Sequence, residues 1–227
     1  MTQMKRRHCY GVDLETQRKA LLESRIAAPF VADVLSRAET ALDKTYEVLK
    51  MSEYMEFCEN GNRKNFETKY LERRNNASYL SIALWLTRDE KYIRPLTDHI
   101  FCICDEFSWC LPAHSFMWEN PPVERVIKYV DLFAAETARL LTEIVVSVGT
   151  ILPYYVTERI RYELHRRIID AFKECDHFHW EDYRSNWPAV CAGGTLAALL
   201  HFGSREEIEE IMPRLFKAAE LFLTSYG

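Results

Sequence analysis

The chain has 227 residues, of which 48% are hydrophobic and 28% are charged, a balance typical of a globular protein and not of a disordered one. Its 7 glycines and 8 prolines are too few for the many tight turns of an all-β sandwich or barrel. The formal net charge of −5 argues against a broad basic surface for nucleic acid, but it leaves room for a local basic patch that meets an acidic substrate.

The sequence predicts neither a membrane span nor a secretory signal. The longest apolar run, residues 144–152, falls well short of the roughly 20 residues that cross a bilayer. The basic residues near the amino terminus are not followed by an apolar segment. The 7 cysteines are odd in number and follow no repeating frame, which favours reduced thiols. We therefore expect a cytoplasmic protein with no membrane partner.

The first half of the chain shows the i, i+3, i+4 apolar spacing of helices from Pro29 onward. The spacing predicts one helix over residues 29–49, a polar break at 59–62 and a second helix over 64–87. Asp89 is the predicted N-cap of a third helix that ends near residue 103. A long aromatic loop follows over residues 105–122.

The second half continues the helical pattern with one further aromatic loop. We predict a long helix over residues 123–148 and another that Pro153 opens and that ends near residue 174. Residues 175–180 form the second aromatic loop, and a helix from Pro188 to residue 203 follows it. Ser204 and Glu207 match a capping box at the start of the last helix.

These elements predict an all-α fold in which residues 1–227 form a single helical domain. About seven or eight helices alternate between long and short connections, as in stacked helical hairpins of about 35–45 residues. No internal sequence repeat is present, so a solenoid of identical units is disfavoured. An α/α barrel or toroid and an irregular bundle both fit this pattern.

Two positions carry candidate chemistry, and each also has a structural interpretation. His114 in the first aromatic loop is suited to acid–base catalysis or to binding a sugar acid, or it is a packed histidine bonded to the backbone. Asn186 and Trp187 precede Pro188, at the electropositive end of a helix that can receive a carboxylate or sulfate. The pattern by itself favours Asn186 as a cap and Trp187 as core.

No cofactor or metal site is predicted. Cys102 and Cys104 lie about 200° apart on a helix, and their spacing to Cys110 fits no standard zinc frame. The histidines at 177 and 179 are suggestive but equally weak as ligands. A glycine-rich phosphate loop and a Gly-x-Ser-x-Gly motif are both absent from the sequence.

Three segments together resemble the heparinase II/III-like polysaccharide lyases, a group that includes alginate lyases. They are residues 105–114 (DEFSWCLPAH), 131–137 (DLFAAET) and 186–194 (NWPAVCAGG), and the third is the most specific. Their order and separation are similar to those in the helical portion of that family, over about residues 65–224. The resemblance implies an incomplete α/α toroid of antiparallel helical hairpins, with the substrate cleft at one end of the hairpins.

The resemblance also implies an activity, the cleavage of uronic-acid polysaccharides by β-elimination. One residue neutralises the uronate carboxylate, a base removes the C5 proton and an acid protonates the leaving oxygen. Asn186 matches the neutralising position, and His114 would lie in the cleft. The residues expected to bind the polysaccharide are His114, Trp109, Trp118, Arg184 and Trp187. Arg184 is instead a solvated charge in the structural interpretation.

The sequence departs from the family in one respect. The segment resembling Glu-Gly-x-x-Tyr, which brings the family's catalytic tyrosine, does not occur here, and the sequence ends at Gly227 where it is expected. We therefore expect the helical part of a longer lyase, inactive by itself and able to self-associate through exposed apolar surface.

Two other function classes stay open at this stage. One is a non-catalytic scaffold that binds carbohydrate or another protein. The other is an α/α-barrel glycoside hydrolase that acts on unsaturated uronides and needs an acid–base pair of aspartates. Asp105, Asp176 and Asp182 are available for that pair, but their spacing singles out no two of them.

Overall fold

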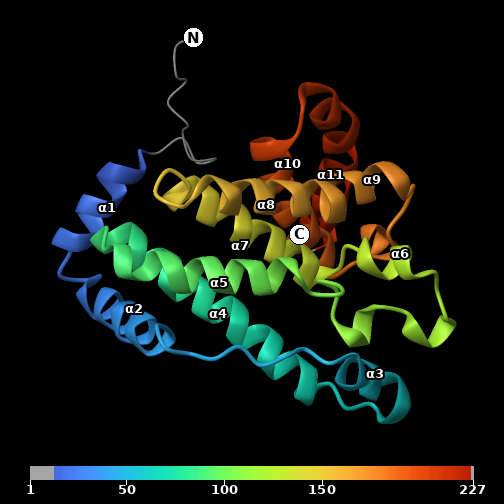
Figure 1. Cartoon of the computed structure of the whole chain (residues 1–227). Helices are drawn as coiled ribbons and strands as arrows, with labels where there is room; N and C mark the ends of the chain where they lie inside the picture. Colours follow the sequence, from blue (N-terminus) through green and yellow to red (C-terminus); the bar gives the residue numbers. More distant parts are fainter. Residues whose placement is uncertain (1–12, 226–227) are drawn as a thin grey trace.

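The computed structural model describes residues 13–225, which are helical with no strand (Figure 1). The helices are α1 (Leu14–Glu23), α2 (Ala28–Ala41), α3 (Met51–Asn60), α4 (Lys64–Thr87), α5 (Ile93–Cys104), α6 (Val123–Ile127), α7 (Leu132–Val148), α8 (Tyr154–Leu164), α9 (Asp170–Glu174), α10 (Trp187–Phe202) and α11 (Arg205–Ser225). A π-helical segment, η4 (His165–Ile169), joins α8 to α9. The prediction of an all-α fold is confirmed for the described residues.

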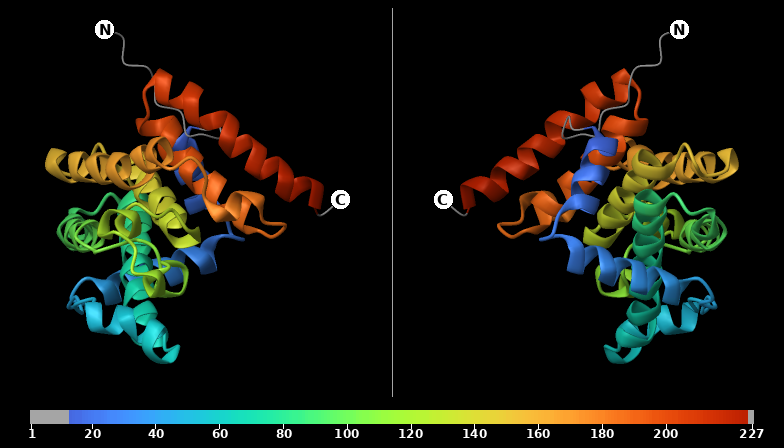
Figure 2. Two further views of the ribbon diagram at one scale, coloured as in Figure 1. Left: turned by 90° about the vertical axis from the view of Figure 1, so that its right-hand side faces the viewer. Right: turned by 90° about the vertical axis from the view of Figure 1, so that its left-hand side faces the viewer.

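Short connections join α4 to α5, α7 to α8 and α10 to α11, and the two helices of each pair pack together. Long connections over residues 105–131 and 175–186 link one pair to the next, and both lie on the right of Figure 1. The predicted alternation of long and short connections is therefore confirmed. Helices α3 and α11 lie on opposite sides of the molecule (Figure 2).

The helices α4 and α7 run side by side in the same direction. The Tyr70 hydroxyl near the start of α4 lies 3.2 Å from the Thr137 hydroxyl near the start of α7. Further along, Ser81 of α4 and Ile144 of α7 line one groove. At Gly194, α10 packs so closely on α7 that an added Cβ would lie 2.2 Å from a backbone oxygen of α7. These contacts bring the amino ends of α7 and α10 to the end of the molecule that carries the long connections.

Several local sequence signals are confirmed. The Asp89 carboxylate accepts a hydrogen bond from the Lys91 amide, although it caps the short turn η1 (Glu90–Tyr92) that precedes α5. Helix α8 begins directly after Pro153. At the start of α11, the Ser204 amide donates to Glu207 and the Glu207 amide donates to the Ser204 hydroxyl, which completes the capping box.

Two predicted helices are wrong in extent. The helix predicted over 29–49 ends at Ala41, and a non-helical segment leads to α3, because Tyr46 packs on His99 of α5 instead of continuing the helical face. The helix predicted over 123–148 is two helices, α6 and α7. Asp131 divides them, because its carboxylate accepts from the Ala134 amide and so starts α7.

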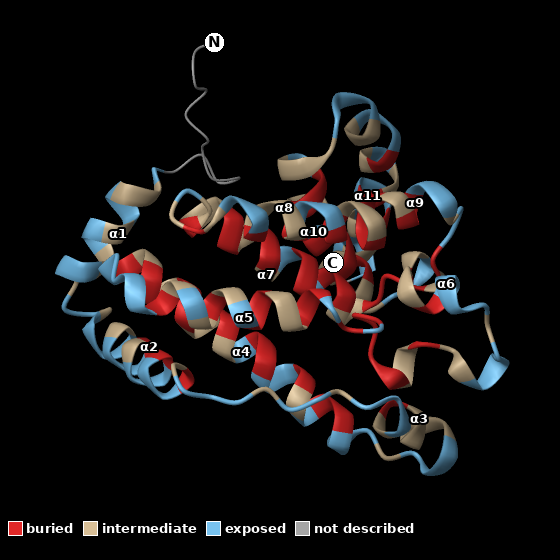
Figure 3. Cartoon of the chain, viewed as in Figure 1, coloured by how far each residue is buried: buried red, intermediate tan, exposed pale blue. Residues whose placement is uncertain are grey.

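Buried residues gather on α4, α5, α7 and α10 (Figure 3). They include charged side chains as well as apolar ones. Glu106, at the start of the first long connection, accepts from Arg73 at 2.9 Å and from Arg74 at 2.7 Å, both on α4. Arg167 of η4 donates to the Glu106 backbone carbonyl at 2.6 Å. Because buried charges are tolerated only when they are fully paired, this network fixes where the long connection leaves α5.

Within residues 13–225, no helix has both the length and the apolar character that crossing a membrane requires. The six cysteines in this range are free thiols, and Cys9 lies outside it. Residues 1–12 and 226–227 also lie outside the described range. They include the basic amino terminus from which the absence of a secretory signal was predicted.

Candidate functional site

The candidate site is built around a histidine–aspartate pair at the amino end of α7. His114 Nδ1 lies 2.6 Å from Asp131 Oδ2. The Asp131 side chain is completely buried and also accepts from the amides of Leu111 and Ala134, at 3.3 and 2.7 Å. A carboxylate held in this way fixes the ring orientation and keeps the proton of a neutral imidazole on Nδ1. The second ring nitrogen, Nε2, is then free to exchange a proton with a bound molecule.

Aromatic rings connect His114 to the second long connection. The Trp187 ring, at the start of α10, lies 4.6 Å from the His114 ring between centroids, and it lies 5.7 Å from the His179 ring. His179 stacks on Tyr129, shares a hydrogen bond with its hydroxyl, and packs edge-on against Phe116. The two long connections therefore form one aromatic wall.

Burial shifts the pKa values of His179 and Tyr129 in this aromatic wall. The pKa of His179 lies below its usual value, first because burial disfavours the imidazolium and second because His114 is close. The pKa of the Tyr129 hydroxyl lies well above its usual value, chiefly because the ring is buried. At neutral pH we expect a neutral imidazole and a neutral phenol, which can exchange hydrogen bonds with a sugar hydroxyl.

A cavity of about 450 Å³ opens beside this wall. Phe116, Tyr129 and His179 line its aromatic side, and Arg125 and Lys128 of the first long connection line its rim. Lys128 is paired with Glu174 at 2.7 Å, whereas Arg125 is exposed and makes no ion pair within the described residues. Glu124 and Glu174 also line this cavity, which therefore combines aromatic rings with side chains of both charges.

Asn186 lies at the tip of α10, directly before Trp187, and its side chain is exposed. It precedes the helix as the N-cap residue, but its side chain makes no capping hydrogen bond. The structural interpretation of Asn186 as a cap is therefore not supported. The Trp187 amide donates to the Ser185 hydroxyl at 3.3 Å and Pro188 has no N–H, so the group that this helix start offers to an anion is the exposed side-chain amide of Asn186.

The other predicted binding residues have different surroundings. Trp109 is 1% exposed and its indole donates to the Ile103 carbonyl at 2.9 Å, so the expected sugar contact is wrong for this residue. Its ring lies in the core with the Arg167 guanidinium over its face, 5.1 Å from the ring centroid. Trp118 is 51% exposed and packs on Phe116 at 5.4 Å between ring centroids. Arg184 is exposed, as both interpretations of it require.

Asp131 and His179 are residues whose role the sequence did not reveal. Asp131 belongs to the second motif, but the sequence assigns it no individual role. An aspartate before an apolar helical run is an N-cap signal, and that signal could have located Asp131. Nothing local in the sequence indicates that His179 meets Tyr129 and Phe116, because these rings come from the other long connection.

The sequence matches no protein-family model and no curated protein. The resemblance to polysaccharide lyases therefore rests on the three motifs alone.

Proposed function

We propose that this chain is the helical, α/α-toroid portion of a polysaccharide lyase that binds a uronic-acid polysaccharide at the amino ends of α7 and α10. Asn186 donates hydrogen bonds to the uronate carboxylate. Trp187 and the aromatic wall hold the sugar rings, and the oriented His114 contacts the substrate through Nε2.

One observation carries this proposal, which is that all three motif segments meet at His114. The histidine itself comes from residues 105–114. Its Nδ1 contacts Asp131, the first residue of the second motif, and its ring contacts Trp187 of the third motif. These segments are separated along the chain, and a shared function at one place explains their meeting better than three independent packing roles do.

The chemistry of β-elimination explains why these residue types suit the site. The C5 proton of a uronate becomes acidic when its carboxylate is neutralised, because negative charge accumulates there as the proton leaves. An exposed amide at the positive end of α10 supplies this neutralisation without a metal or a formal charge. A carboxylate-oriented imidazole nearby can hold or move a proton.

The aspartates give little support to the hydrolase alternative. Asp105 is exposed and pairs with Arg159 at 2.8 Å, and Asp182 pairs with His177 at 3.0 Å. Asp176 is exposed, and no hydrogen bond or ion pair joins it to either of the other two aspartates within residues 13–225. A scaffold that binds carbohydrate without chemistry shares the proposed binding surface, so the experiment must separate binding from turnover.

The binding experiment is calorimetric titration of the chain with oligosaccharides from alginate and from heparan sulfate, and with the same oligosaccharides after reduction of their carboxyl groups. We expect Asn186→Ala to weaken binding of the acidic sugars about tenfold or more, the cost of one hydrogen bond to a charged group. Asn75→Ala, which changes an exposed asparagine on α4, is the matched control and should bind as the native chain does. Equal affinity of the Asn186→Ala variant and the native chain would contradict the proposal.

Turnover is measured by the ultraviolet absorbance of the unsaturated uronate product. Because the sequence has no Glu-Gly-x-x-Tyr segment, we expect binding without turnover from this chain alone. Clear product formation would contradict the assignment of the catalytic tyrosine to that segment. Binding that is unaffected by reduction of the carboxyl groups would instead favour the scaffold alternative.

A further inference from the structure

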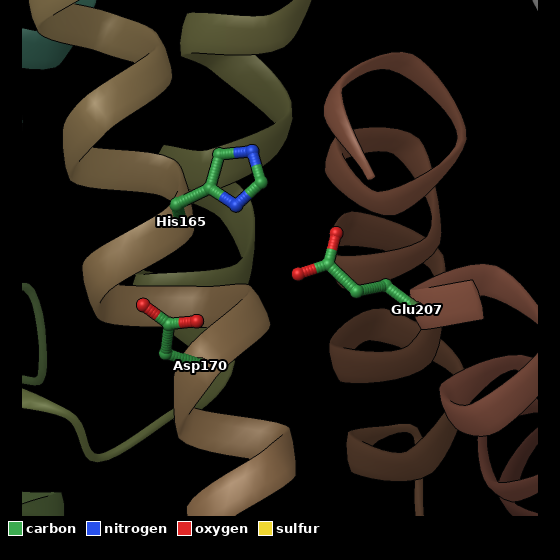
Figure 4. Close-up of side chains that lie close together, drawn as sticks. All are labelled: His165, Asp170 and Glu207. Carbon is green, nitrogen blue, oxygen red and sulfur yellow. The ribbon is translucent and has the colours of Figure 1, made fainter. Parts of the chain in front are cut away.

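A second cluster of chemically active side chains lies away from the candidate site, where η4 and α9 face the start of α11 (Figure 4). His165, Asp170 and Glu207 each offer one ligand atom, and these atoms all lie within 4.8 Å of one another. All three side chains are partly buried. The cluster is close to Phe202 at the carboxyl end of α10, whereas Asn186 is at its amino end, about 24 Å away for a helix of this length.

The π-helical segment is what brings His165 and Asp170 together. Residues five apart in an α-helix point about 140° away from each other. In η4 the Asp170 amide instead donates to the His165 carbonyl, so the two residues lie one turn apart on the same face. A π segment interrupts the regular hydrogen bonding of a helix, and such segments are frequent at functional sites.

The imidazole of His165 is already oriented as a ligand. Its Nε2 lies 3.1 Å from the Phe202 carbonyl oxygen, which can only accept, so Nε2 carries the proton. The lone pair is therefore on Nδ1, and Figure 4 shows a ring nitrogen directed toward the space between Asp170 and Glu207. A backbone carbonyl that holds the second nitrogen is the usual support of a metal-binding histidine.

The two carboxylates complete the set. Glu207 uses Oε2 to accept from the Ser204 amide at 2.8 Å, which leaves Oε1 directed elsewhere, 3.5 Å from Lys173. The Asp170 side chain makes no hydrogen bond or ion pair within residues 13–225, and its carboxylate is available.

We propose that His165, Asp170 and Glu207 bind a first-row divalent cation, with zinc as the occupant, and that the metal ties α11 to the α8–η4–α9 arm. One imidazole nitrogen and two carboxylate oxygens leave a fourth position of a tetrahedral site for water. Zinc binds such ligands at about 2.0–2.2 Å, so the distances between the three ligand atoms must shorten by roughly an ångström when the ion binds. This site is independent of the proposed polysaccharide site.

The test is titration of the metal-free full chain with Zn²⁺ against a fluorescent zinc chelator. We expect one zinc per chain and at least a tenfold loss of affinity in Asp170→Asn. Because the Asp170 side chain has no other partner in the described residues, this variant should fold normally, which circular dichroism checks. Zinc should raise the melting temperature of the native chain but not that of the variant.

Two further variants separate this site from a general affinity of surface histidines and acids for zinc. His177→Ala removes a histidine that lies between Glu181 and Asp182 on the surface, and it should bind zinc as the native chain does. Lys173→Met removes the cation beside Glu207 and should leave the affinity unchanged or higher. The proposal fails if the native chain binds no stoichiometric zinc, or if Asp170→Asn binds it as tightly as the native chain.

Discussion

At the scale of single residues, Asp131 connects stability with the candidate site. Its buried carboxylate serves the start of α7, the Leu111 amide and His114 at the same time. We expect Asp131→Ala to lower the free energy of unfolding by about 3 kcal/mol, because it removes a helix cap and leaves buried donors unpaired. Urea unfolding measures this. Ser204→Ala is the matched control, since Ser204 caps α11 at an exposed position and should cost about 1 kcal/mol. Equal losses in the two variants would mean that burial adds nothing to the role of Asp131.

At the scale of elements, the close contact between α7 and α10 depends on Gly194, the second of two consecutive glycines in α10. A Cβ on Gly194 would lie 2.2 Å from the Ala135 backbone oxygen, whereas a Cβ on Gly193 would meet nothing within 4 Å. We expect Gly194→Ala to destabilise the fold by about 3 kcal/mol, since the backbone of α7 must move. Gly193→Ala should stabilise it by about 0.5–1 kcal/mol through helix propensity. Thermal unfolding of both variants measures the difference, and similar behaviour of the two would show that the helices are not in the contact described.

At the scale of the whole molecule, burial of His99 makes stability depend on pH. Burial, together with the nearby Arg73, lowers the pKa of His99 from 6.5 to about 4. The unfolded chain therefore binds this proton more readily, and stability falls as the pH drops from about 6.5 toward 4. Between about pH 7 and pH 5 we expect a loss of about 2 kcal/mol in unfolding free energy. His99→Phe keeps a ring against Tyr46, 4.6 Å away between centroids, and should lack this component in urea unfolding at the two pH values. An identical pH dependence of variant and native chain would exclude His99 as its source.

The sequence by itself determined the features that depend on neighbours along the chain. The apolar spacing located α4 to its last residue, and the Ser204–Glu207 capping box and Pro153 marked helix starts that the structure confirms. These signals are local, because a cap or a helical face is formed by residues within about four positions of each other. The all-α class follows from the same signals.

Only the tertiary structure decided where helices break and which side chains meet. The chain leaves the helix before Tyr46 because that ring packs on α5, and Trp109 lies in the core with the Arg167 guanidinium over its face. The same holds for both sites. His114 meets Trp187, and His165 meets Glu207, across segments that no local pattern connects. The physical reason is that a packing contact stabilises the fold whatever the separation of its residues along the chain. Sequence periodicity, in contrast, describes only the residues of one helix.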